Sequence, residues 1–344
     1  MVEYILTALI LVVFGNIVKS KKEKSFIFIV CLWMALIIGL RDYTIGTDTY
    51  TYSIIYRVMG NTSLSSYIAD NGYGELLFFI LNNIMYSLSL PFQFLLIIEA
   101  ILIMWPVYKF TTEHSKIPWF SLMLFLGLGS MQQAMNVSRQ YIAIGLILIA
   151  AIYAFNEQKK KFLLFVILAF MFHSSALIAI FIYPIVNNRQ RNLNWIYIAL
   201  VPMGFIILNL FSGITMKYMP ENYINDSNGG GYKILILWII ILIVLLFYSK
   251  YCKDQIVNIE IRLLSISIFF QSFVSDFVVI GRISYFFSIL FYLLLPNIFI
   301  NISEYKSRII IIQISTSLVL IYYIFISLYR GASNTVPYKW GAFL

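Results

Sequence analysis

The sequence predicts an all-α protein that crosses a membrane many times, and three observations support this. Hydrophobic residues make up 61% of the 344 residues and charged residues only 11%, whereas a water-soluble domain carries roughly 25% charged residues. Apolar runs of about 18 residues or more recur along the chain, each long enough to cross a bilayer as a helix. Runs such as 234–247 do not alternate in polarity, which argues against a β-barrel. We therefore expect a single integral membrane domain over residues 1–344, with about 12 to 14 transmembrane or re-entrant helices.

The basic residues predict the sides of the loops. They lie in short loops between apolar runs, which favours a topology signal over nucleic-acid binding despite the net charge of +9. Residues 1–18 predict a first helix that is retained, because no basic stretch precedes it and no small-residue cleavage site follows it. The clusters expected on the cytoplasmic side are Lys19 with Lys21, Lys22 and Lys24, Lys159 to Lys161, Arg189 with Arg191, Lys250 with Lys253, and Lys306 with Arg308.

With these clusters inside, the remaining loops and both termini are expected outside. The outer segments would be residues 41–73, the start of the helix at Arg139, residues 212–231, and the turn from Asp276 to Arg282. The 212–231 segment is rich in Asn, Asp and Gly, which is typical of a loop. It could be a mobile loop over a site or a plain connector.

Two segments do not fit a simple series of crossings. Residues 74–90 are moderately apolar but contain Glu75 and two asparagines, so we expect a re-entrant or incompletely spanning helix. Residues 162–186 have basic clusters at both ends, which requires a helical hairpin that turns near His173.

The first candidate site is residues 41–52, directly after an apolar run. Arg41, Asp42 and Asp48 bring an arginine and two carboxylates to one helix exit. Asp48, Tyr52 and Tyr56 recur every four residues, so a helix starting near residue 47 would present them on one face. Thr47 or Asp48 could cap this helix, which we expect to lie along the outer membrane interface. The alternative is an interfacial helix with ordinary solvated charges.

The second candidate site opens the apolar helix that begins near residue 138. Arg139 carries a planar guanidinium suited to phosphate oxygens, and the neighbours Asn136, Ser138 and Gln140 make the position more polar than lipid contact requires. The alternative is an arginine that reaches from the helix end to the membrane surface.

Two further candidate sites follow. His173, with Ser174, stands in an otherwise apolar stretch and could act in chemistry or simply pack. Arg282 precedes Tyr285, an arrangement that places a cation beside an aromatic wall. Arg282 could instead be neutralised by Asp276 across the turn.

These sites share one predicted side of the membrane. Arg41, Arg139 and Arg282 all face outward on this topology and would together bind a polyanion. Arginines suit a pyrophosphate leaving group, whose oxygens gain charge in the transition state. Asp48 or Asp42 could deprotonate an attacking hydroxyl. Two distant histidines and two cysteines predict neither a metal site nor a disulfide framework.

The candidate motifs, in this order, resemble the EpsG family of exopolysaccharide proteins, which is related to the Wzy-type polysaccharide polymerases. The segments that carry the resemblance are Arg41-Asp42-Tyr43, Gly46-Thr47-Asp48 with Tyr52, Ser138-Arg139-Gln140, Phe172-His173-Ser174-Ser175-Ala176, Gly281-Arg282 with Tyr285-Phe286, and Val336-Pro337-Tyr338-Lys339.

The resemblance implies a GT-C-like glycosyltransferase in the bacterial cytoplasmic membrane, with its active site on the outer face. The donor would be an undecaprenyl-pyrophosphate-linked oligosaccharide, transferred to another lipid-linked repeat unit during exopolysaccharide or capsule synthesis. Membrane lipid and, in the same pathway, a flippase and a chain-length regulator would be partners, and no cofactor or metal is expected.

The resemblance also implies roles for residues. Arg139 and Arg282 would hold the pyrophosphate, Asp48 would be the leading candidate for the base, and His173 would support the site or bind sugar. The other residues expected to contact pyrophosphate or sugar are Arg41, Gln140, Tyr52 and Tyr285.

Three other functions stay open. A flippase for the same lipid-linked glycan would also need arginines facing a cavity, although transporters often show internal repeats and none is visible here. A membrane O-acyltransferase would use His173 as its base, but the outward-facing arginines would then have no clear role. A structural subunit of a synthesis complex would carry out no chemistry.

Overall fold

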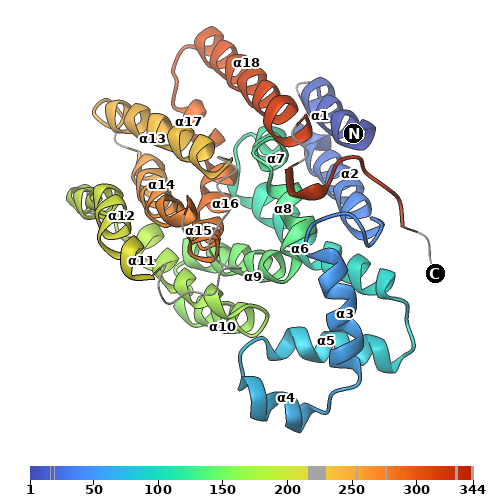
Figure 1. The fold of residues 1–344 in the computed structure, drawn as a ribbon. Coiled ribbons are helices and arrows are strands. Elements are labelled where there is room, and N and C mark those ends of the chain that lie inside the picture. Colours follow the sequence, from blue (N-terminus) through green and yellow to red (C-terminus); the bar gives the residue numbers. More distant parts are fainter. Residues whose placement is uncertain are drawn as a thin grey trace. The chain divides into compact units, whose positions relative to one another are not determined.

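The protein is described here by a computed structural model, which covers residues 1–15, 17–18, 20–215, 230–252, 254–275, 277–329 and 332–341. Within these ranges the chain is helical, with one isolated antiparallel bridge between Arg41 and Trp340 and no strand (Figure 1). The predicted all-α fold class is confirmed. Asp276, Lys19, Lys253 and most of the predicted 212–231 loop lie outside the described residues.

Helix length and hydropathy make this a multi-pass membrane protein. In the described ranges, the helices long and apolar enough to span a membrane number six, namely Phe92–His114, Ser138–Phe155, Arg191–Leu210, Gln255–Val274, Val278–Ile300 and Tyr305–Phe325. The shorter apolar helices are Val2–Gly15, Leu76–Ser87, Pro118–Gly127, Ser174–Asn187 and Lys233–Tyr248. The predicted number of crossings and the predicted sides of the loops stay predictions.

The chain forms two compact units, and unit 1 comprises residues 1–177 and 302–344. Its α-helices are α1 (Val2–Gly15), α2 (Ser20–Gly39), α3 (Thr49–Gly60), α4 (Leu64–Asn71), α5 (Leu76–Ser87), α6 (Phe92–His114), α7 (Pro118–Gly127), α8 (Ser130–Asn136), α9 (Ser138–Phe155), α10 (Lys159–Phe170) and α18 (Tyr305–Tyr322). The short 3₁₀ helix η1 (Ser174–Phe181) crosses the boundary to unit 2.

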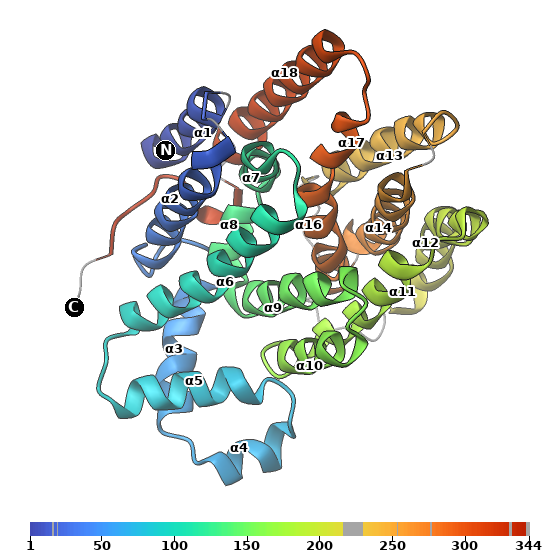
Figure 2. The ribbon, with the colours of Figure 1, turned by 180° about the vertical axis from the view of Figure 1, so that it is seen from behind.

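Helix α6 is central in unit 1, because it packs against both α2 and α9, and α9 in turn packs against α10. Gly145 permits the close approach of α6 and α9: a Cβ there would stand 2.7 Å from the carbonyl oxygen of Leu102. Helix α3 lies against α5, as both views show (Figures 1 and 2). Helix α5 also contacts α6, so both α5 and α9 are positioned by α6.

A C-terminal segment, residues 338–341, pairs with residues 40–42 after α2. The Asp42 N–H donates to the Lys339 carbonyl at 2.9 Å, and the Gly341 N–H donates to the Leu40 carbonyl at 2.7 Å. The Tyr338 hydroxyl donates to the Ile37 carbonyl at 2.7 Å. The first candidate motif is therefore bounded by residues from the far end of the sequence.

Unit 2 comprises residues 178–301. Its α-helices are α11 (Ile182–Asn187), α12 (Asn194–Thr215), α13 (Gly230–Tyr248), α14 (Gln255–Gln271), α15 (Val278–Arg282), α16 (Tyr285–Leu294) and α17 (Pro296–Ile300). Helix α14 packs against α12, α13 and α16.

The buried Arg262 of α14 donates to the Asn194 side chain at 2.8 Å and to the Asn188 and Gln190 carbonyls at 2.6 and 2.7 Å. This arginine holds the connection before α12 and has a structural role.

The structure also addresses the two segments that did not fit a simple series of crossings. Helix α5 has 12 residues, a length of about 18 Å, and is too short for a hydrocarbon core of about 30 Å, in agreement with an incompletely spanning segment. Helix α10 ends at Phe170, and a turn at residues 171–173 precedes η1. The predicted turn near His173 is confirmed, whereas the reversal of chain direction stays a prediction.

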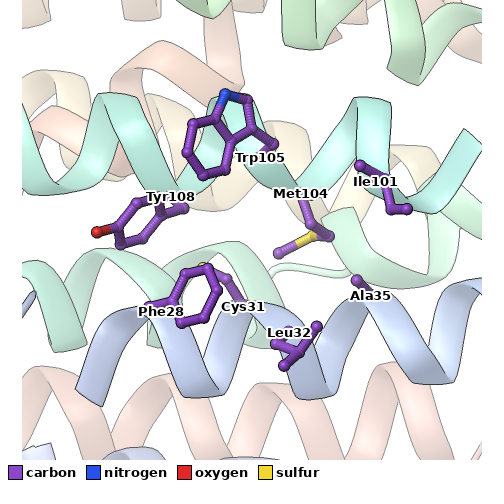
Figure 3. A pocket seen from close by; sticks show the side chains of 8 residues that line it. All are labelled: Phe28, Cys31, Leu32, Ala35, Ile101, Met104, Trp105 and Tyr108. Atoms are coloured by element: carbon purple, nitrogen blue, oxygen red, sulfur yellow. The ribbon is translucent and has the colours of Figure 1, made fainter. Parts of the chain in front are cut away.

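An apolar cavity of about 310 Å³ opens between α2 and α6 (Figure 3). Its lining carries no charged side chain, so it offers surface for hydrocarbon and none for a phosphate. The lining residues are Phe28, Cys31, Leu32, Ala35, Ile101, Met104, Trp105 and Tyr108.

Candidate functional site

The structure brings the side chains of Glu75, Arg139 and His173 together in unit 1. Arg139 Nη1 donates to Glu75 Oε2 at 2.5 Å, and His173 Nδ1 lies 3.1 Å from Glu75 Oε1. They come from the loop before α5, the start of α9 and the turn after α10. Their side chains are 22%, 27% and 24% exposed for Glu75, Arg139 and His173 respectively. We call these residues the Glu75 cluster; it is shielded but still open to a ligand.

The backbone around Glu75 is fixed by contacts from two other segments. The Leu77 N–H donates to the Met171 carbonyl at 2.9 Å, and the Tyr67 hydroxyl donates to the Gly74 carbonyl at 3.0 Å. The Ser174 N–H donates to the Glu75 carboxylate. These bonds hold Glu75 in the left-handed region, at φ 58°, a conformation that costs about 1–3 kcal/mol for a residue other than glycine. Such strain is typical of functional sites.

Aromatic rings enclose Arg139. Its guanidinium carbon lies 5.5 Å from the centre of the Tyr52 ring and 5.4 Å from that of Phe78, within the range of cation–π attraction. Arg139 also donates a hydrogen bond to the Tyr52 hydroxyl. The structure therefore brings two of the predicted site residues, Tyr52 and Arg139, into contact.

The electrostatics of the cluster favour a charged carboxylate. Burial alone would raise the pKa of Glu75, but the hydrogen bond with His173 and the charge of Arg139 outweigh it and hold the pKa below its ordinary value. Burial raises the pKa of Tyr52 even though Arg139 opposes it, so the Tyr52 hydroxyl stays neutral and accepts from Arg139. Glu75 is thus an anion between a cation and an imidazole.

The predicted helix after the first motif is confirmed as α3, and Asp48 is the residue that precedes its first turn. Neither Thr47 nor Asp48 caps the helix with its side chain; instead the Thr47 hydroxyl shares its one proton between Asp48 Oδ1, at 3.1 Å, and Asn136 Oδ1. Asn136 Oδ1 accepts from the Asp48 N–H at 3.1 Å and from the Thr47 hydroxyl. Tyr52 and Tyr56 are buried on the α3 face that continues from Asp48. The first two candidate sites are therefore neighbours.

Gly46 allows this loop to approach α8. Its φ is +93°, and a Cβ there would stand 2.9 Å from the Met135 carbonyl oxygen and 2.8 Å from the Thr49 hydroxyl. The Thr49 hydroxyl donates to the Ile45 carbonyl at 2.6 Å. Only glycine fits this position without displacing the backbone.

Asp42 and Arg41 are engaged in local structure. Asp42 Oδ1 accepts from the N–H and the hydroxyl of Thr44 at 2.9 and 2.6 Å, which stabilises the turn after α2. Arg41 is fully buried and donates to the Ile38 carbonyl, while its Nε and Nη2 have no hydrogen-bond partner among the described residues. Their roles with substrate stay predictions.

Two glutamates near the site were not predicted as site residues. Glu75 showed only as a polar residue before an apolar helix. Glu99, in α6, is 1% exposed and interacts electrostatically with both Arg41 and Arg139. Within the described ranges, neither of its carboxylate oxygens accepts a hydrogen bond of ordinary geometry. Arg41, Glu99, Arg139 and Glu75 thus alternate in charge through unit 1. Charged residues inside apolar segments are the signal that could have identified both glutamates.

The remaining predicted residues lie elsewhere. Gln140 is buried at the start of α9. Arg282 ends α15 and interacts electrostatically with Tyr285, which begins α16 in unit 2. The placement of the Arg282 cation against an aromatic ring stays a prediction. Convergence of Arg282 with the Glu75 cluster stays a prediction. No group of three or more His, Cys, Asp or Glu side chains in the described chain could hold a metal ion.

Comparisons with known proteins identify the family. No curated protein and no solved structure matches the chain. The EpsG family matches residues 24–340, a range that holds every site residue described above. The chain therefore belongs to the EpsG family, and this membership implies a role in exopolysaccharide biosynthesis.

Proposed function

We propose that the protein is a membrane glycosyltransferase that polymerises undecaprenyl-pyrophosphate-linked oligosaccharide repeat units on the outer face of the bacterial cytoplasmic membrane. The transfer forms a bond between a hydroxyl oxygen of one repeat unit and the anomeric carbon of another. The bond from that carbon to the pyrophosphate breaks, and undecaprenyl pyrophosphate leaves. Such a site needs positive charge for the leaving group and a group that takes the hydroxyl proton.

The Glu75 cluster is the observation that supports this proposal. It combines a guanidinium, a carboxylate and an imidazole in one partly exposed place, within contacts of 2.5 and 3.1 Å. Membership of a family with a role in exopolysaccharide biosynthesis supports a sugar substrate. Asp48 is half-buried and interacts electrostatically with Tyr52, so a second carboxylate lies near Arg139 and the Glu75 cluster.

Arg139 would contribute to pyrophosphate binding while it keeps its contact with Glu75. Its Nη1 donates to Glu75, and its buried Nε has no hydrogen-bond partner among the described residues. Leaving a buried donor unsatisfied is costly, by about 1–3 kcal/mol or more for a charged group. A phosphate oxygen that reached Nε would satisfy it. Arg282 would supply further positive charge, as the family resemblance implies.

The test is polymerisation by the purified protein in lipid nanodiscs, with a lipid-linked repeat unit as the sole substrate. A ladder of longer lipid-linked products is expected, and Arg139→Ala should reduce its rate by about 10²-fold or more. The control is Arg57→Ala, because Arg57 is an exposed arginine of α3. A wild-type protein that makes no ladder contradicts the proposal.

A membrane O-acyltransferase is the second candidate, because an imidazole paired with a carboxylate also suits acyl transfer to a hydroxyl. In cells, loss of an acyltransferase would leave polymer of normal length without acyl groups. Loss of a flippase would leave single repeat units on the inner leaflet. Loss of the polymerase would leave single repeat units on the outer leaflet.

A further inference from the structure

We infer that His173 is the general base of the reaction and that Glu75 is the residue that positions it. This inference rests on the proposed glycosyl transfer and assigns its proton acceptor to the imidazole, with Asp48 left to a different task. It is carried by the hydrogen-bond geometry of His173 and by the way the chain fixes Glu75.

One ring nitrogen of His173 is committed and the other is available. Nδ1 lies 3.1 Å from Glu75 Oε1, and Nε2 makes no hydrogen bond with any residue that the structure describes. A carboxylate on Nδ1 selects the tautomer that carries its proton there, because the carboxylate accepts that N–H. The lone pair then lies on Nε2, the nitrogen able to take a proton from a substrate hydroxyl.

Glu75 is built to orient the imidazole rather than to react. It accepts from His173 on Oε1, from Arg139 on Oε2 and from the Ser174 N–H. The backbone bond between Leu77 and Met171 ties the two segments together on either side of this contact. A carboxylate with both oxygens engaged has little capacity left for a substrate proton, whereas its charge stabilises the imidazolium that forms.

The two carboxylates predicted as candidate bases, Asp42 and Asp48, make other contacts. Asp42 Oδ1 already accepts both donors of Thr44. Asp48 is held through its N–H by Asn136, and its Oδ1 accepts from Thr47. We assign Asp48 to binding of the acceptor sugar, whose hydroxyls are donors to a carboxylate.

In the step, the acceptor hydroxyl oxygen attacks the anomeric carbon of the donor as its proton moves to His173 Nε2. The bonding electrons of the anomeric carbon–oxygen bond leave with undecaprenyl pyrophosphate. His173 then returns the proton to water. Besides His173, the charged and titratable groups in and around the cluster are Glu75, Arg139, Tyr67 and Tyr52. A pH–rate profile therefore reports on all of these groups together.

The experiment measures polymerisation kinetics and pH–rate profiles of the full-length protein in nanodiscs. His173→Gln should lower kcat by about 10²–10⁴-fold, with a KM within a few-fold of the wild-type value. Glu75→Gln should lower kcat by about 10-fold or more and should alter the acidic limb of the pH–rate profile. Asp48→Asn should act mainly on KM. The matched control is His114→Gln, the same substitution at the other histidine of the chain, which stacks on Phe155.

A chemical rescue separates a catalytic role from a structural one. His173→Ala should regain activity when imidazole is added, because the free imidazole replaces the missing proton acceptor, and Glu75→Asp should retain more activity than Glu75→Gln. The assignment is overturned if His173→Gln keeps kcat within about threefold of wild type, or if imidazole leaves a well-folded His173→Ala inactive. Because wild-type protein is assayed alongside, a missing wild-type ladder refutes the glycosyl transfer itself, whereas an intact ladder with an active His173→Gln refutes only this assignment.

Discussion

The side-chain oxygen of Asn136 accepts a hydrogen bond from the N–H of Asp48 at 3.1 Å. The two residues are 88 positions apart in the sequence, and each belongs to a different predicted motif. Asn136 is the last residue of α8, and Arg139 lies three residues later, in the first turn of α9. This bond therefore sets the position of the first motif relative to the start of α9, and through α9 relative to the Glu75 cluster.

Removing the Asn136 side chain should loosen the first motif. In Asn136→Ala the Asp48 N–H loses its acceptor, at a cost of about 1–3 kcal/mol for a donor left unsatisfied, whereas the exposed Thr47 hydroxyl keeps Asp48 Oδ1 as an acceptor. We expect a lower thermal unfolding temperature in detergent and a higher KM in polymerisation. Asn61→Ala is the control, because Asn61 is exposed and its amide donates to the Arg57 carbonyl. Equal unfolding temperatures for wild type and Asn136→Ala would contradict this role.

Acidification should destabilise the protein partly through Glu75. The pKa of Glu75 is lower in the folded protein than its ordinary value of 4.5. A carboxylate of this kind stabilises the fold above its ordinary pKa and loses that contribution as the pH falls through the lowered pKa. Between about pH 5 and pH 3, wild type should therefore lose more thermal stability than Glu75→Gln. Parallel stability curves for the two proteins would show that Glu75 is not held as an anion.

Arg41 and Glu99 should behave as a coupled buried pair. Both are almost fully buried, and each is a source of opposite charge for the other. Arg41→Gln or Glu99→Gln alone removes the opposite charge that acts on the other buried residue and should destabilise the protein, by about 1–3 kcal/mol. The double variant should be more stable than the sum of the single effects predicts, which a double-mutant cycle of thermal stability measures. Additive effects would mean that the two charges are compensated by other groups.

Gly46 and Gly72 provide a matched test of backbone strain against steric contact. Both have positive φ, +93° and +65°, but a Cβ would clash at Gly46 and would meet nothing within 4 Å at Gly72. Gly72→Ala should cost about 1–3 kcal/mol from backbone conformation alone, because φ 65° with ψ −149° lies near a region that essentially only glycine adopts. Gly46→Ala should cost clearly more and should also raise KM, because the clash pushes the loop away from Met135. Unfolding temperatures that match in the two variants would show that the loop yields without penalty.

The sequence predicted much of the fold but only part of the site. Apolar runs of helical length predicted the all-α class, and the spacing of Asp48, Tyr52 and Tyr56 predicted α3, because both signals are local. The contact of Arg139 with Glu75 depends on the arrangement of α5, α9 and α10, which local spacing does not encode. Glu75 looked like a polar interruption of an apolar segment, because an isolated glutamate has no spacing pattern with partners 64 and 98 residues away.

The pairing of residues 338–341 with residues 40–42 has a consequence for biogenesis. Residues 40–42 are synthesised directly after α2, yet the groups that satisfy the Leu40 carbonyl and the Asp42 N–H are synthesised only after α18. Translation must therefore reach residue 341 before this corner can close, and until then its polar backbone needs water or the insertion machinery as a partner. A bulky fusion placed directly after residue 341 would act on the Arg41 region, far away in sequence, and a cleavable or flexible spacer is the better choice for tagging the protein.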